Sequence, residues 1–147
     1  MLARIHAVAG LLAGATILTF WLSTAVVELG GSAAAVTAVK TAIPWGLLLL
    51  IPALALTGAT GFRLAGKRED ALVQAKRRRM PIIAGNGLLI LVPAAFFLAW
   101  KASTGRFDEA FYAVQGIELL AGAVNLALIG LNLRDGLRAS GRLQGAA

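Results

Sequence analysis

The sequence predicts an all-α integral membrane protein, an antiparallel four-transmembrane-helix bundle. Its composition is 59% hydrophobic and 14% charged, with a mean hydropathy of +0.79, whereas soluble domains are about 45–50% apolar and about 25% charged. Four long apolar runs each approach the roughly 20 residues that cross a bilayer. The apolar residues in these runs are continuous rather than alternating, which disfavours a β-barrel.

The expected spans cover about 5–28, 41–62, 81–100 and 109–133, and with short loops they fill 1–147 as a single membrane domain. The first apolar run is longer than the roughly 7–15-residue core of a signal peptide, so we expect a retained span. The second helix can begin earlier, in the Ala-rich stretch 33–39. Pro52 lies in mid-span and predicts a kink.

The stretch 63–80 is a polar connection, in which 70–79 can form a short interfacial helix. Pro81 suits the first position of the third span, and Pro93 is a second candidate for a kink. The Gly85-Asn86-Gly87 sequence permits close backbone approach or a local distortion. Asp108 is the expected N-cap of the fourth span.

The net charge of +7 is explained by membrane topology, and we expect no nucleic-acid partner. Eleven of the 14 Lys and Arg residues lie in the N-terminus, the 63–80 connection and the C-terminal tail. Positive-inside bias therefore places both termini in the cytoplasm, and we expect a bacterial inner membrane. A basic run is also able to bind anionic lipid. Its members are Lys76, Arg77, Arg78 and Arg79.

Polar side chains interrupt the fourth span at helical spacing and form a stripe with apolar neighbours. The stripe comprises Phe111, Gln115, Glu118, Gly122, Asn125, Ile129 and Asn132. Hydrocarbon offers such polar groups no partners, so the stripe must face other helices or a cavity.

Glu118 is the most costly residue of the chain to place in a membrane. No Lys or Arg falls within the core of any expected span, so we expect the carboxyl group to be neutral or hydrogen-bonded. The expected partners are Gln115, Asn125 or a Thr of a neighbouring helix. Two roles stay open, a proton or ligand contact and an interhelical hydrogen bond that fixes packing.

This topology places several polar groups at one depth in the cytoplasmic half of the membrane: His6, Asn86, Asn132 and the 57–61 stretch. They would form a small polar vestibule for a headgroup, a cofactor edge or water. The alternative is simple hydrogen bonding between helices. On the opposite side, Trp21, Trp45 and Trp100 fit an aromatic belt.

His6 is the single histidine and the candidate metal ligand, with haem b as the leading cofactor and quinone second. Membrane b-type haems usually take axial histidines from facing helices. One His per chain cannot supply two axial ligands. Two arrangements remain: a five-coordinate haem, or a homodimer in which each copy donates His6 and the Gly10 and Gly14 face brings the two copies together. Residues available for the propionates are Arg4, Arg63 and Arg134. The alternative is an interfacial His that faces water or headgroups.

No hydrolytic constellation or metal-binding spacing appears in the sequence, so an enzyme is not expected. Three functions remain. The first is a non-enzymatic binding module, dimeric or otherwise homo-oligomeric, that holds haem, quinone or lipid and takes part in electron transfer. Its candidate residues are His6, Arg4, Arg63, Asn86, Gln115, Glu118, Asn125 and Asn132. The second is an accessory subunit of a larger membrane complex. The third is a small oligomeric transporter or channel with Glu118 as the coupling acid.

Overall fold

The computed structural model describes residues 1–66 and 70–139. In this part the chain forms five α-helices and one π-helical turn: α1 (Leu2–Gly30), α2 (Ala33–Ala65), α3 (Ala71–Asn86), η1 (Gly87–Leu91), α4 (Val92–Ser103) and α5 (Glu109–Ala139). Because α3, η1 and α4 follow one another without a break, they form one rod. Its residues 71–103, with α1, α2 and α5, give four helices that are long and apolar enough to cross a membrane.

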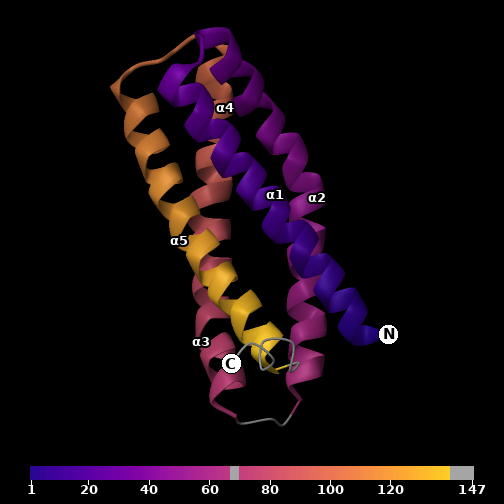
Figure 1. Cartoon of the computed structure of the whole chain (residues 1–147). Helices are drawn as coiled ribbons and strands as arrows, with labels where there is room; N and C mark the ends of the chain where they lie inside the picture. Colours follow the sequence, from indigo (N-terminus) through magenta and orange to yellow (C-terminus); the bar gives the residue numbers. More distant parts are fainter. Residues whose placement is uncertain (67–69, 140–147) are drawn as a thin grey trace.

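The four long helices pack as an antiparallel bundle, as the sequence predicts (Figure 1). The turn between α1 and α2 and the loop between α4 and α5 lie at one end, which we call the hairpin end. The start of α1, the end of α2, the start of α3 and the end of α5 lie at the other, which we call the terminal end. The helix α2 packs on α1 and α4, whereas α3 packs on α5. No extensive packing joins α2 to α3 in the described part of the chain.

Short polar residues define where three of these helices begin. The backbone N–H of Ala35 donates to the Ser32 hydroxyl at the start of α2, and that of Val73 donates to Asp70 at the start of α3. Asp108 accepts a 3.1 Å hydrogen bond from the backbone N–H of Phe111. The Asp108 N-cap is therefore confirmed.

Two helix starts bear directly on the predictions. The helix α2 begins at Ala33, at the early limit that the Ala-rich stretch allowed. The prediction that Pro81 starts the third span is wrong, because α3 begins at Ala71 and Pro81 lies inside it. The segment expected as a separate interfacial helix is thus continuous with the span. Lys67 and Arg68 of the polar connection lie outside the described residues.

The π-helical turn η1 begins directly after Asn86, so the local distortion expected at Gly85-Asn86-Gly87 is confirmed. The backbone N–H of Val92 bonds the carbonyl of Gly87, five residues earlier. Pro93 follows at once, where it lacks an N–H and its ring crowds the preceding turn. A wider turn just before a proline relieves that crowding. By contrast α2 is one helix through Pro44 and Pro52, and a kink at Pro52 stays a prediction.

Two clusters of buried apolar side chains hold the bundle together. The larger lies among α1, α2 and α4 and comprises Ala13, Ile17, Ile43, Leu47, Leu50, Ala53 and Ala95. The smaller lies at the hairpin end and comprises Val36, Leu98, Ala102 and Phe111. The candidate site lies beside them, between the α1–α2 pair and the remaining helices.

Candidate functional site

The polar stripe of α5 faces the interior of the bundle, as the sequence predicts. Phe111, Gln115 and Asn125 are at most 3% exposed. At Gly122 an added Cβ would lie 2.8 Å from Cδ1 of Trp21, so this position is in tight contact with α1. The amides of the stripe are therefore sheltered from lipid by the chain itself, and each is available to the interior.

Glu118 is paired with Lys40 of α2. The Lys40 ammonium donates to Oε2 of Glu118 and, at 3.3 Å, to the hydroxyl of Thr24 on α1. Lys40 is 1% exposed. The expectation that no Lys or Arg is available to Glu118 is wrong, because Lys40 lies inside α2 rather than in an outer loop. The expected bond to Gln115 is present, with Nε2 donating to Oε2 of Glu118 at 3.3 Å.

Two further oxygens near this pair have no hydrogen-bond partner among the residues that the structure describes. They are the buried Oε1 atoms of Glu28 and Gln115. Glu28 interacts electrostatically with both Lys40 and Glu118. One ammonium thus sits among two carboxylates, a hydroxyl and an amide, contributed by α1, α2 and α5. In a low-dielectric interior such a cluster interacts strongly with any charge or proton that reaches it.

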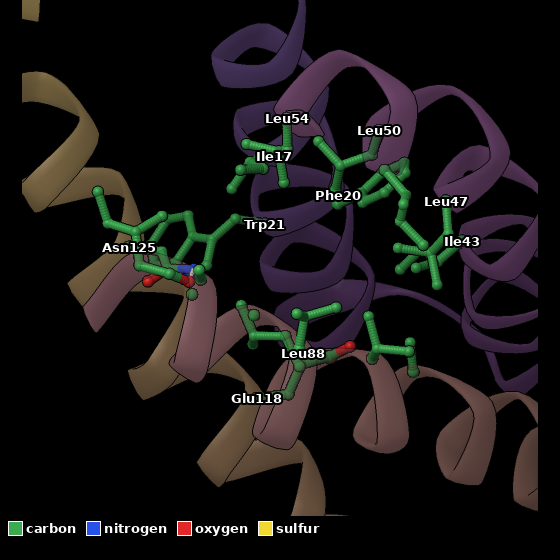
Figure 2. A pocket seen from close by; sticks show the side chains of 18 of the residues that line it. Ile17, Phe20, Trp21, Ile43, Leu47, Leu50, Leu54, Leu88, Glu118 and Asn125 are labelled. Carbon is green, nitrogen blue, oxygen red and sulfur yellow. Dashed lines mark hydrogen bonds between the residues drawn. The ribbon is translucent and has the colours of Figure 1, made fainter. Parts of the chain in front are cut away.

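A cavity of about 430 Å³ runs beside this cluster (Figure 2), within the usual range for ligand pockets of about 300–1,000 Å³. Its wall is almost entirely apolar, with Leu47, Leu54 and Leu88 among its lining residues. The polar lining residues are Trp21, Thr24, Glu118 and Asn125. The arrangement suits an apolar molecule with few polar atoms.

The cavity opens to the side of the bundle, between α2 and α3. On this side it is lined by Ile51 and Phe62 of α2 and by Leu88 of η1, which are 43%, 68% and 60% exposed. The opening coincides with the lack of extensive packing between α2 and α3. In a bilayer this opening faces the acyl chains, so a ligand could enter without crossing a polar surface.

Trp21 lies in the wall of this cavity (Figure 2). Its indole Nε1 donates to the carbonyl of Leu119 at 2.9 Å. The assignment of Trp21 to an aromatic belt is therefore wrong, because the side chain points into the bundle. Trp45 and Trp100 are 75% and 51% exposed, which fits the belt.

Asn86 and Asn125 form a second polar contact at the cavity. The amide nitrogen of Asn86 donates to Oδ1 of Asn125 and to the carbonyl of Ala121, both at 2.8 Å. Asn125 in turn donates to the carbonyl of Ile83 at 3.4 Å. The contact ties the end of α3 to α5 where η1 begins, and it satisfies both amides within the protein.

His6 lies apart from the cavity, on the contact between α1 and α2. Its Nδ1 is 3.1 Å from both the carbonyl of Thr57 and the hydroxyl of Thr60. Because a carbonyl only accepts, Nδ1 carries the proton, and in the neutral ring Nε2 is then the free acceptor. This tautomer is the one that a metal-binding Nε2 needs. The haem and the metal at His6 stay predictions.

The expected dimer face is used within the chain. A Cβ at Gly10 would lie 3.6 Å from Thr57, and one at Gly14 would lie 3.6 Å from Ile129. The assignment of these two glycines to a contact between two copies is therefore wrong. They face α2 and α5 instead, with room for a Cβ at ordinary van der Waals distance.

The other predicted residues lie near the terminal end, and the shared vestibule stays a prediction. Asn132 accepts a 3.3 Å bond from Arg79, which also donates to Asp135 at 2.6 Å. Arg4 and Arg63 are exposed. Within the part that the structure describes, no hydrogen bond joins the His6, Asn86 and Asn132 groups. Of the basic run, Arg77 donates to the carbonyl of Gly66 at 2.7 Å, and Arg78 is exposed.

Three site residues were missed by the sequence analysis, Thr24, Glu28 and Lys40. The signal for Lys40 was present, because a helix that starts after the Ser32 cap places position 40 about two turns inside. Thr24 has no such signal, since its role depends on the rotation of α1 in the bundle. A comparison of the chain with protein-family models, curated proteins and solved structures gave no match.

Proposed function

We propose that the protein is a non-enzymatic membrane binding module whose cavity holds an apolar molecule from the bilayer, a quinone or a lipid. The observation that carries the proposal is the cavity of about 430 Å³, which is apolar, opens between α2 and α3, and ends at the Lys40–Glu118 pair. His6 is not among the lining residues, which favours quinone or lipid over haem. A bound quinone would give the module a part in electron transfer.

Trp21 supplies a direct test because it lines the cavity. A variant with Trp45→Phe and Trp100→Phe keeps Trp21 as the sole tryptophan of the chain. Titration of this variant in nanodiscs with a decyl-substituted benzoquinone should quench its fluorescence to a saturating level. Mass spectrometry of an organic extract of the purified protein should identify the natural ligand, and a Soret band lost in His6→Ala would point to haem instead.

Two glycine variants provide the matched control. Gly58 lines the cavity, whereas Gly116 is exposed and does not, and a Cβ at either position would meet nothing within 4 Å. Gly58→Leu should fill part of the cavity and weaken quenching, and Gly116→Leu should leave it unchanged. Quenching that does not saturate, or that both variants leave unaltered, would overturn the proposal.

A second candidate is a proton-coupled transporter with Glu118 as the coupling acid, favoured by the burial of the Lys40–Glu118 pair. Intramembrane acids paired with a base are common in proton pathways. Liposome flux that is lost in Glu118→Gln and retained in His6→Ala would support this function. In either case the basic residues of the terminal end favour a cytoplasmic position for that end.

A further inference from the structure

The polar end of the cavity has hydrogen-bonding capacity that the protein itself does not use. Thr24 and Glu118 both line the cavity, and both are bonded to the same ammonium, that of Lys40. Thr24 is 2% exposed and Lys40 is 1% exposed. These groups are therefore held in fixed positions next to one another, on α1, α2 and α5.

Thr24 has a spare donor. Its oxygen accepts from Lys40, and no acceptor for its hydroxyl proton is found in residues 1–66 and 70–139. Thr57 and Thr60 behave differently, since their hydroxyls donate to carbonyls four residues earlier, at 2.7 and 2.6 Å. A buried hydroxyl that lacks one of its bonds is destabilising unless another molecule completes it.

Glu118 has a spare acceptor. Lys40 and Gln115 both donate to Oε2, and Oε1 accepts no hydrogen bond from the described residues. A carboxylate oxygen beside an apolar cavity is costly to leave without a donor. One donor and one acceptor, both on groups bonded to Lys40, are thus left open in a wall that is mostly apolar.

We propose that the cavity takes an apolar molecule that ends in a hydroxyl group, phenolic or aliphatic. The hydroxyl oxygen accepts from Thr24, and the hydroxyl proton is donated to Oε1 of Glu118. A carbonyl would use only the Thr24 donor and would bring its oxygen close to the carboxylate. An ammonium has no lone pair with which to accept from Thr24. For a quinone ligand the reduced form, the quinol, should therefore bind more tightly than the oxidised form.

This inference rests on the proposed function, and its test compares ligands that differ only at the head. The probes are a decyl-substituted hydroquinone and its dimethyl ether, and farnesol and its methyl ether. Affinities are taken from the rise in unfolding temperature of the protein with ligand concentration, which depends on the dissociation constant. Hydroxyl probes should bind the wild-type protein about tenfold more tightly than their ethers. The pair with the larger ratio distinguishes a phenolic from an aliphatic ligand.

Substitution of Thr24 gives the specific control. Thr24→Val removes the donor and should bring the affinity ratio close to one, while Thr24→Ser retains the hydroxyl and should keep the ratio. If Thr24→Val does not fold, the ratio of hydroxyl to ether affinity in the wild-type protein tests the inference by itself. If the hydroxyl probes and their ethers bind with equal affinity, and Gly58→Leu weakens both, the headgroup inference is overturned. The proposal that the cavity binds an apolar ligand would then still hold. No stabilisation by any probe would overturn both.

Discussion

Lys40 on α2 and Glu118 on α5 form an ion pair inside the bundle, although 78 positions separate them in the chain. The pair joins the α1–α2 hairpin to the hairpin formed by the long rod and α5. It also determines the position of Thr24 and Gln115, which bond to its two members. The polar end of the cavity therefore depends on this one contact.

Removal of either member of the pair leaves the other buried without its hydrogen-bonded counter-charge. We expect Lys40→Met and Glu118→Leu each to lower the free energy of unfolding by about 3–5 kcal/mol. The double variant should lose less than the sum of the two, because both members of the pair are then gone and Glu28 is the one charge of the cluster that remains. Unfolding of the four proteins in detergent by heat or denaturant measures this coupling. Additive losses would show that the two groups do not stabilise the fold as a pair.

The pair also shows where prediction from the sequence stops. The spans, their antiparallel order and the inward stripe of α5 follow from the length and periodicity of apolar residues. The partner of Glu118 does not, because it depends on how α2 is placed and rotated against α5. The assignment of Trp21 to the aromatic belt was wrong for the same reason. The sequence shows how deep a residue lies along a helix, but it does not show how the helix is rotated about its axis. The prediction that Pro81 begins the third span was wrong because the polar stretch before the apolar run is also helical.

Gly122 should tolerate no side chain. A Cβ there would lie 2.8 Å from Cδ1 of Trp21, so Gly122→Ala must displace the indole from its bond to the Leu119 carbonyl. We expect a loss of about 1–3 kcal/mol in stability and a shift in the Trp21 emission maximum. The control is Gly130→Ala on the same helix, where an added Cβ meets nothing within 4 Å. Equal unfolding temperatures for the two variants would contradict the close contact.

Asp108 should make stability depend on pH at the hairpin end. The Lys101 ammonium, 2.5 Å away, and the backbone N–H of Phe111 hold the pKa of the Asp108 carboxyl below its ordinary value of 3.8. A lowered folded-state pKa means that the unfolded chain binds more protons, so this contribution is complete above about pH 4 and is lost as the pH falls through the folded pKa.

The matched variant is Asp108→Asn, which can still cap α5 but cannot pair with Lys101. The wild-type protein should unfold at a higher temperature than Asp108→Asn at pH 6, and the difference should shrink as the pH falls below about 4. A difference that stays constant down to pH 3 would show that the Lys101 contact contributes nothing.

Arg78 and Arg79 are adjacent in the chain but differ in their contacts. Arg79 donates to Asp135, which is 3% exposed, and to Asn132, whereas Arg78 is exposed. Among the described residues, Arg79→Gln leaves the Asp135 carboxylate with the longer Arg134 contact of 3.5 Å, so we expect a loss of about 2 kcal/mol or more. Arg78→Gln should leave stability within about 0.5 kcal/mol of wild type.

The same two variants separate stability from lipid binding. If the basic run binds anionic lipid, Arg78→Gln should weaken the association of the protein with soluble anionic-lipid micelles, since Arg78 is exposed. Arg79→Gln, measured at a temperature where it is folded, should affect this association less. The opposite order would place the lipid contact at Arg79.

The π-helical turn Gly87–Leu91 acts as a one-residue insertion in the rod that runs from Ala71 to Ser103. One residue corresponds to about 100° of rotation in an α-helix, so the two parts of the rod present different faces to the same neighbours. Asn86 meets Asn125 on α5, and beyond the turn Ala95 and Leu98 enter the two apolar clusters. Deletion of one residue here would leave a regular helix but swing Ala95 and Leu98 away from those clusters. This segment therefore has to preserve the rotation between the two parts of the rod, rather than the identity of any one side chain in the turn.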